Sequence, residues 1–209
     1  MAKSNLNFDK IKEYLFEKDP KLKRIILDKN CIFFFEQTKF SNITLSLHIC
    51  ESIVGQQLSV KSAKSIWKKI YLKNNKNTLK TISKFSINDY KKIGLSRSKI
   101  SFIQDIARNT LNKKINFNKY YYMSDDQIIE DLIKIRGIGS WTAEMFLIFS
   151  MRRINVFSKK DTGLISAIKK LYKINNYNEN RLNLIIKRWE PYKSIVSIYL
   201  WRALDSKII

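Results

Sequence analysis

Glycine and proline are scarce in this chain, and this scarcity restricts its fold more than any other feature. Only 5 Gly and 2 Pro occur among 209 residues. Because these residues are the usual breakers of regular structure, their scarcity favours long helices joined by short links. Polar links are expected at residues 73–77 (KNNKN) and 113–119 (KKINFNK). The chain is long enough to bury a sizeable core in one or two small domains.

Apolar residues recur at helical spacing along most of the chain. The pattern is carried by Ile43, Leu47, Cys50 and Val54, by Ile66 and Ile70, by Ile100, Ile103, Ile106 and Ala107, and by Ile195, Ile198 and Tyr199. Pro191 stands where the first residue of the last of these helices is expected. No convincing strand-like alternation runs longer than four residues, so the sequence predicts an all-α fold of about ten helices.

The chain is strongly basic, with 40 Lys and Arg against 18 Asp and Glu and a net charge of +22. Such an excess indicates a polyanionic partner or an anionic surface. Lys, Asn and Ile are all abundant, as in proteins from AT-rich genomes, and that bias would raise Lys without any functional reason. It would not deplete Glu, so we interpret the charge as functional.

The few cysteines and histidines exclude several kinds of site. With only Cys31, Cys50 and His48, a four-cysteine iron–sulfur cluster is excluded and zinc is not expected. His48 lies on a mostly apolar helix and is interpreted as structural. One cysteine pair is no disulfide framework, which fits a reducing cytoplasm. The apolar runs at 31–35 and 145–149 are far shorter than the about 18 residues of a membrane span, so a soluble protein is expected.

Residues 124–151 contain the most informative pattern in the chain. Ser124 and Gln127 have the spacing of a capping box at the start of a helix. Four residues then form one apolar helix face, namely Ile128, Ile129, Leu132 and Ile133. The helix is predicted to end at residues 135–139 (IRGIG), and a second apolar helix follows at once. The sequence therefore predicts two helices joined by a tight turn.

The turn between these helices has the composition of a phosphate-binding site. Gly137 and Gly139 allow positive φ and a close approach of the backbone to a ligand. Their N–H groups, with those of the next helix's first turn, would point outward without acceptors and bind an anion. Arg136 adds a charge beside them. The alternative is a tight helix–helix turn with two convenient glycines. The basic chain favours a hairpin that holds a DNA phosphate without reading bases.

Four segments in order resemble the helix-hairpin-helix DNA glycosylases, and among them the 3-methyladenine DNA glycosylase II (AlkA-type) group. They are residues 53–60 (IVGQQLSV), 94–99 (GLSRSK), 135–143 (IRGIGSWTA, followed by Asp161 twenty residues after Trp141) and 189–201 (WEPYKSIVSIYLW). The similarity runs from about residue 45 to residue 204. It implies an all-α, two-lobed glycosylase fold with a helix-hairpin-helix motif and a central cleft.

The resemblance also implies a domain organisation. The chain is expected to be a single glycosylase unit of two lobes, one at about 45–150 with the hairpin, and one made of the N-terminal helices and about 155–209. About 40 residues precede the match, too few for the β-rich domain of many relatives, so a compact form is expected. Arg136 stands where the family usually has proline, which predicts a looser turn with an added phosphate contact.

Asp161 is the catalytic residue that the resemblance implies. Leu164, Ile168 and Leu171 indicate a helix over residues 161–172. A carboxylate at its start could stabilise the oxocarbenium character of a sugar, or orient the attacking water, after the base has been flipped out of the duplex. The alternative is that Asp161 is only an N-cap, which is a common use of aspartate.

The resemblance places a base pocket at Trp141, Tyr192 and Met145. Electron-rich rings would attract an alkylated, positively charged purine, although ordinary core packing is the alternative for both aromatic residues. Bifunctional relatives carry a nucleophilic lysine at the position of Trp141. A monofunctional enzyme without lyase activity is therefore expected. Lys159 and Lys160 lie near enough in sequence to weaken this expectation slightly.

Two further sites follow from the resemblance. Gln57 occupies the wedge position that fills the gap left by the flipped nucleotide, and neighbouring Leu58 could serve instead. Alternatively, Gln56 and Gln57 merely cap a helix end. The backbone carbonyls of Ile133, Ile135 and Ile138 match those that hold a monovalent cation, Na⁺ or K⁺, in relatives. No other cofactor is expected.

The sequence thus predicts a monofunctional, monomeric DNA glycosylase of base excision repair, associated with the nucleoid in the cytoplasm. Its partner would be double-stranded DNA containing alkylated purines of the 3-methyladenine and 7-methylguanine type. Three alternatives remain. They are a non-catalytic helix-hairpin-helix DNA-binding protein, a glycosylase for deaminated or mismatched bases, and a basic nucleoid- or ribosome-associated protein.

Overall fold

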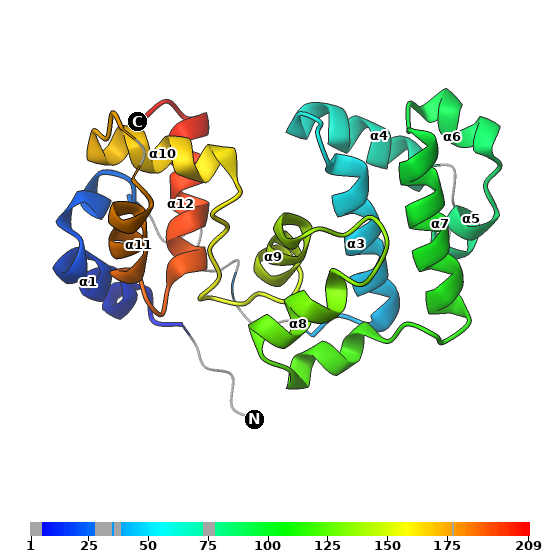
Figure 1. Cartoon of the computed structure of the whole chain (residues 1–209), viewed down its shortest axis with the longest axis horizontal. Helices are drawn as coiled ribbons and strands as arrows, with labels where there is room; N and C mark the ends of the chain where they lie inside the picture. The colour runs from blue at the N-terminus through cyan, green and yellow to red at the C-terminus, as the bar shows by residue number, and fades with distance from the viewer. Residues whose placement is uncertain (1–5, 28–34, 36–38, 73–77, 177) are drawn as a thin grey trace. The chain divides into compact units, whose positions relative to one another are not determined.

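The computed structural model describes residues 6–27, 35, 39–72, 78–176 and 178–209. All regular structure in these ranges is helical, with eleven α-helices and two 3-10 helices and no strand. Figure 1 shows them in chain order. The predicted all-α class is confirmed. Cys31 and the expected link at 73–77 lie outside the described residues.

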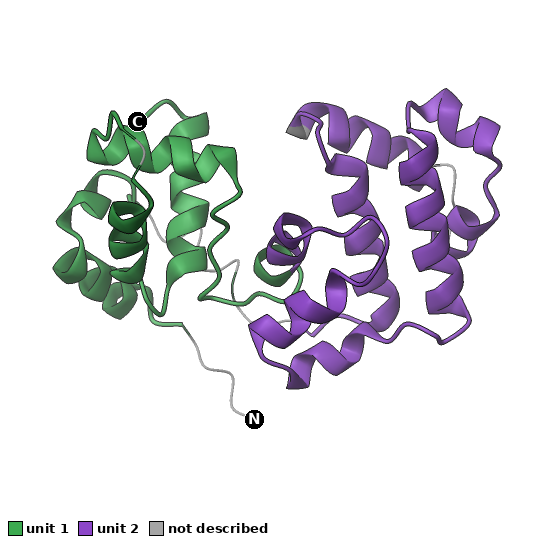
Figure 2. Cartoon of the chain, viewed as in Figure 1, with its two compact units in different colours: residues 1–38, 147–209 green, residues 39–146 purple. Residues whose placement is uncertain are grey.

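The chain divides into two compact units, which Figure 2 shows in different colours. Unit 1 comprises residues 1–38 and 147–209, and unit 2 comprises residues 39–146. Unit 1 is therefore built from two separate stretches of chain. The second boundary falls within α9 (Ser140–Phe149), so this helix contributes residues to both units.

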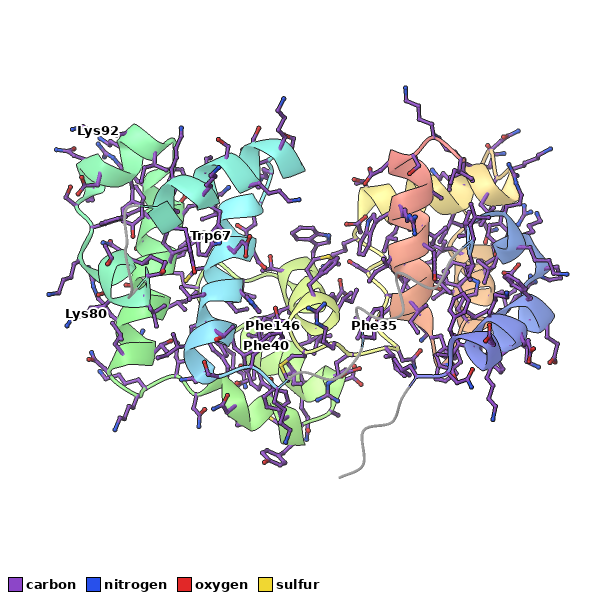
Figure 3. All side chains as sticks on the ribbon, turned by 180° about the vertical axis from the view of Figure 1, so that it is seen from behind. Phe35, Phe40, Trp67, Lys80, Lys92 and Phe146 are labelled. Atoms are coloured by element: carbon purple, nitrogen blue, oxygen red, sulfur yellow. The ribbon has the colours of Figure 1, made fainter. Side chains whose placement is uncertain are left out.

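Unit 2 is organised around α3 (Asn42–Gly55) and α7 (Arg97–Leu111), which lie side by side in Figure 1. The remaining elements of this unit are α4 (Val60–Leu72), α5 (Thr78–Lys84), α6 (Ile87–Ile93), η2 (Phe117–Tyr122) and α8 (Asp125–Leu132). On α7 the predicted apolar face is buried, namely Ile100, Ile103, Ile106 and Ala107. Phe146, labelled in Figure 3, belongs to an aromatic cluster in which its ring centroid lies 6.0 Å from that of Phe117.

The buried face of α3 differs from the predicted one. Cys50 and Val54 are buried, but Ile43 is 51% exposed. The core face of this helix consists instead of Leu45, Ile49, Cys50, Ile53 and Val54. The helix is apolar on more than one side, so periodicity alone could not select the face that α7 covers.

The predicted link at 113–119 is also shorter than expected. Phe117 begins the 3-10 helix η2 and is fully buried. Its apolar ring belongs to the aromatic cluster of unit 2, whereas its polar neighbours in sequence suggested a solvated loop. Burial of one large ring thus ends the link early.

Unit 1 joins α1 (Phe8–Lys18) and η1 (Pro20–Arg24) to α10 (Thr162–Tyr172), α11 (Glu179–Lys187) and α12 (Lys193–Asp205). In α12 the predicted Ile195 and Tyr199 are buried, and this helix packs on α10. Its first residue is Lys193 and its N-cap is Tyr192. Pro191 therefore precedes the helix, contrary to its predicted place as the first helical residue.

A buried carboxylate connects the two stretches of unit 1. Asp19 is 1% exposed and accepts hydrogen bonds from the Tyr172 hydroxyl and from Trp189 Nε1, the latter at 3.1 Å. Burial, followed by the bond to Asp19, raises the pKa of the Tyr172 phenol. Since a buried carboxylate is stable only with such donors, η1 is held against the C-terminal helices.

Candidate DNA-binding hairpin and carboxylate site

The helix that enters the hairpin begins at the predicted capping box. Ser124 Oγ accepts from the Gln127 N–H at 3.3 Å, and Gln127 Oε1 accepts from the Ser124 N–H at 3.0 Å. The helix α8 ends at Leu132, earlier than predicted. Ile133 is its C-cap and is 48% exposed, so the prediction that Ile133 belongs to the apolar face is wrong. The loop between the helices consequently spans residues 133–139.

The two glycines of the loop have different roles. Gly137 has φ +92°, and a Cβ built on it would clash with the ring of Phe102. A side chain is therefore excluded there by conformation and by space. Gly139 is outside the positive-φ region, and a Cβ there would meet nothing within 4 Å. The prediction of positive φ is confirmed at Gly137 and wrong at Gly139.

The loop presents a concentration of positive charge and open donors. The N–H groups of Gly137 and Gly139 have no acceptor among the described residues. They lie beside the N-terminus of α9, which favours anions. Arg136 is exposed, and its guanidinium group lies 5.2 Å from the centre of the Phe102 ring. The loop can therefore receive an anionic group such as a phosphate.

The three isoleucines implied as cation ligands lie along this loop. Ile133 is exposed, Ile135 is half-buried and Ile138 is buried. The Ile135 carbonyl already accepts a hydrogen bond from the Ile138 N–H at 3.0 Å, which leaves one lone pair on that oxygen. In the part of the chain that the structure describes, no group of three or more His, Cys, Asp or Glu side chains could hold a metal ion.

The two wedge candidates lie in an exposed turn after α3. Gln57 has φ +58°, a rare conformation for a residue with a side chain, and Leu58 is 39% exposed. Gln56 caps α3 and donates from Nε2 to the Gly137 carbonyl at 2.9 Å and to Thr142 Oγ1 at 3.0 Å. The residue that precedes the wedge candidates is thus hydrogen-bonded to the hairpin.

Asp161 is held at the start of α10 in unit 1. As the N-cap of that helix, its Oδ1 accepts from the Leu164 N–H at 2.8 Å, and it also accepts from Trp201 Nε1 at 3.0 Å. The Trp201 ring stacks on Phe149 with centroids 5.5 Å apart. The carboxyl group is half-buried. The N-cap interpretation of Asp161 is confirmed as its structural role, and Trp201 gives it a second donor that a simple cap does not need.

Sequence reasoning missed the partners of Asp161. The sequence places Trp201 in the C-terminal segment 189–201 but gives no sign that it meets Asp161, and Gly163 belongs to none of the four segments. A Cβ at Gly163 would lie 3.1 Å from Asp161 Oδ1 and 3.5 Å from Trp201 Nε1. The spacing Asp-Thr-Gly at the start of a helix was an available signal, since a glycine beside a cap often makes room for another group.

The predicted base-pocket residues are divided between the units. Trp141 and Met145 are one turn apart on α9 in unit 2, where Trp141 is half-buried and Met145 is 7% exposed. Tyr192 belongs with Asp161 to unit 1, and its half-buried ring meets that of Tyr14 edge-on at 5.5 Å.

His48, interpreted as structural from the sequence, contacts Phe40 edge-on at 5.0 Å. Among the described residues, no helix is both long and apolar enough to cross a membrane.

With this geometry established, the class of protein follows from comparison with known families. Residues 50–191 match the model of the HhH-GPD superfamily of base excision DNA repair proteins, and the chain belongs to this family. The matched region contains the wedge candidates, the hairpin and Asp161. The resemblance inferred from the four sequence segments is confirmed.

Two curated relatives resemble this chain over different shares of its length. The DNA-3-methyladenine glycosylase of Saccharomyces cerevisiae is 25% identical over 248 aligned positions, covering 99% of this chain and 83% of that protein. Bacillus subtilis YfjP is 34% identical over 126 residues, or 60% of this chain. The match spans only 44% of the length of YfjP.

Solved structures show the same fold. The DNA-3-methyladenine glycosidase of Bacillus halodurans superposes with a TM-score of 0.66 and 28% identity, covering 90% of this chain and 91% of that one. Schizosaccharomyces pombe 3-methyladenine DNA glycosylase, solved in complex with abasic DNA, gives a TM-score of 0.77 at 22% identity, with coverage of 93% and 96%. The second likeness supports the fold alone.

Proposed function

We propose that this chain is a monofunctional DNA glycosylase of base excision repair that hydrolyses the N-glycosidic bond of flipped, alkylated purines and leaves an abasic site. The observation that carries the proposal is the Asp161 carboxyl group. Two N–H donors fix Oδ1 at the start of α10, within the region that matches a family of base excision repair proteins.

Each step of the reaction has a candidate residue. The donors of Gly137 and Gly139 hold a phosphate of the DNA backbone, so the enzyme binds without reading sequence. Gln57 or Leu58 fills the space that the flipped nucleotide leaves. As the glycosidic bond breaks, the Asp161 carboxylate stabilises the positive charge that develops on the deoxyribose. The alkylated base departs as a neutral purine with the bonding electron pair, water then adds at C1′, and the proton of that water passes to solvent.

The absence of a lysine at position 141 supports a hydrolytic route. Trp141 has no amine that could attack the sugar to form a Schiff base. Lys159 and Lys160 are the nearby amines in the sequence, and the Nζ of Lys159 lies 4.0 Å from Glu179 Oε1. The proposed product is therefore an abasic site in an uncut strand.

The proposed substrates follow from the aromatic residues. Alkylation at N3 or N7 of a purine places positive charge on the base, and Trp141 and Tyr192 offer electron-rich faces worth about 0.5–2 kcal/mol each to such a cation. The same alkylation weakens the glycosidic bond, so selectivity needs only a loose pocket. The backbone carbonyls of Ile133, Ile135 and Ile138 would hold a monovalent cation, whose positive charge would favour the approach of a DNA phosphate.

The test is base release from defined duplexes containing 3-methyladenine, 7-methylguanine, hypoxanthine or uracil. We expect release of the two methylated purines, no strand cleavage before alkali treatment, and loss of release in Asp161→Asn with DNA binding retained. Preferential release of hypoxanthine or uracil would overturn the substrate class. Binding without any release would reduce the chain to a DNA-binding protein, and equal activity of Asp161→Asn would overturn the mechanism.

A further inference from the structure

We propose that Lys99 is a positioning residue that holds the wedge turn, residues 55–58, in the shape needed to enter DNA, and that Gln56 fastens this turn to the phosphate-binding hairpin. The inference rests on the proposed function and adds to it a residue that neither contacts DNA nor touches the reacting atoms. It assigns a role to the second of the four sequence segments, residues 94–99, which the chemistry above does not use.

The ammonium group of Lys99 lies against the end of α3. Its Nζ donates to the carbonyl of Val54 at 2.8 Å and to the carbonyl of Gln56 at 2.5 Å. The last carbonyls of a helix lack donors within that helix, and a cation there is favourable. Lys99 comes from the first turn of α7, 43 residues beyond Gln56, so this bond connects two separate helices of unit 2.

The second of these bonds acts on the strained residue of the turn. The Gln56 carbonyl belongs to the planar peptide group that precedes Gln57. A hydrogen bond that holds this oxygen also fixes the orientation of the whole peptide plane. The φ angle of Gln57, +58°, describes the rotation of its backbone relative to that plane. A left-handed conformation in a residue with a side chain costs about 1 kcal/mol or more and persists only where its surroundings impose it. Lys99 supplies that constraint.

The side chain of the same residue reaches the hairpin. Gln56 Nε2 donates to the Gly137 carbonyl at 2.9 Å and to Thr142 Oγ1 at 3.0 Å. Gln56 is therefore held through its carbonyl by α7 and through its amide by the hairpin and α9. Gln56 thus links the hairpin, which would bind a phosphate, to the wedge turn, which would fill the gap in the base stack.

Lys99 differs from the lysines expected to contact DNA. It is only partly exposed, and its ammonium group is directed at two carbonyls within unit 2. Burial lowers the pKa of this lysine below its usual range. By contrast, Lys92 lies exposed at the outer edge of the same unit (Figure 3). Removing Lys99 should therefore leave the number of phosphate contacts unchanged.

The first experiment compares Lys99→Met, Lys99→Arg and the matched charge control Lys92→Met in single-turnover release of a methylated purine. Each is assayed in a fully paired duplex and in single-stranded DNA, where little flipping is needed. We expect Lys99→Met to slow release about tenfold or more from the duplex and less than about threefold from the single strand. Lys99→Arg should restore most of the duplex rate, and Lys92→Met should retain both rates.

A second variant guards against a folding defect. Gln56→Met removes both side-chain donors but keeps the backbone carbonyl that Lys99 binds, and it should show the same selective loss on duplex DNA. Equal loss on both substrates for Lys99→Met and Gln56→Met would overturn the inference. So would a fall of about one in the slope of log affinity against log salt for Lys99→Met, which would make Lys99 a phosphate contact.

A second readout is independent of catalysis. In a duplex with an abasic site opposite 2-aminopurine, entry of the wedge should raise the fluorescence, and Lys99→Met should lose at least half of that rise. If the wild type releases no base, the proposed function is overturned. The fluorescence of 2-aminopurine would then still test whether Lys99 positions the wedge turn. Full fluorescence with Lys99→Met would overturn the positioning role alone.

Discussion

In the proposed mechanism Asp161 combines a structural role, as the N-cap of α10, with a chemical one. It ends the loop before α10 by capping that helix, and the same oxygen accepts a hydrogen bond from Trp201. A cap alone contributes about 1 kcal/mol to stability. The second donor instead restricts the direction of the carboxyl group, which would matter if Asp161 faces a sugar as we propose.

Gly163→Ala tests that direction. The added methyl would lie 3.1 Å from Asp161 Oδ1 and push the carboxyl group aside. We expect the rate of base release to fall about tenfold or more, because small displacements of catalytic groups are costly. The free energy of unfolding should stay within about 1 kcal/mol of the wild type, since alanine is the better helix former.

Trp201→Phe separates position from packing at the same site. Phenylalanine keeps a ring against Phe149 but lacks the indole N–H that reaches Asp161. Release should slow while thermal unfolding shifts little. If both Trp201→Phe and Gly163→Ala release bases at the wild-type rate, the orientation of the carboxyl group does not limit the reaction.

At the scale of the element, the hairpin contains one glycine that the fold requires, Gly137, and one that we propose binds a phosphate, Gly139. Gly137→Ala should lower the free energy of unfolding by more than about 2 kcal/mol, because φ is positive and Phe102 occupies the space. Gly139→Ala should be neutral to within about 0.5 kcal/mol, since its methyl would enter open space.

For DNA affinity, the variant with the larger expected effect is Gly139→Ala. The Gly139→Ala methyl would occupy the side from which a phosphate approaches, so affinity for undamaged duplex should fall about tenfold. Denaturant unfolding and fluorescence anisotropy measure the two effects. Wild-type affinity in Gly139→Ala would show that the phosphate does not bind at this loop.

An ion pair near the C-terminal end of α8 predicts how the free energy of unfolding depends on pH. Asp131 accepts from Lys119 Nζ at 2.8 Å and from the Tyr120 hydroxyl at 2.8 Å. These bonds, the Lys119 bond first, lower the pKa of Asp131 from its ordinary 3.8. The stabilisation is therefore present above pH 3.8 and is lost as pH falls through the lowered pKa.

Asp131→Asn measures this contribution. Because the pair is partly solvated, the variant should be only about 0.5 kcal/mol less stable than the wild type at pH 7. The difference should shrink as pH falls below 3.8. A difference that is constant from pH 7 to pH 3 would attribute the effect to packing.

At the scale of the whole molecule, the net charge of +22 predicts the salt dependence of binding. Each phosphate contact adds about 0.9 to the slope of log affinity against log salt, so six contacts would weaken binding about a thousandfold between about 50 and 200 mM salt. Undamaged and damaged duplex should give similar slopes, because the contacts are to the backbone. A flat response would contradict phosphate binding by the hairpin.

The properties predicted correctly from the sequence depend on residues close together in the chain. Helical periodicity, scarce glycine and the Ser124 capping box involve neighbours within one or two turns, so they indicate the all-α class and the start of α8 directly. The positive φ at Gly137 was likewise readable because only glycine adopts it freely.

The tertiary structure alone decided which groups meet. Trp201 lies 40 residues from Asp161, and Lys99 lies 43 from Gln56, so no local pattern pairs them. Packing also determined which face of α3 is buried. It placed no atom within 4 Å of a Cβ at Gly139, so nothing inside the protein requires glycine there. Local preferences fix the conformation of each helix, whereas hydrogen bonds and burial between distant segments appear only once those helices have packed together.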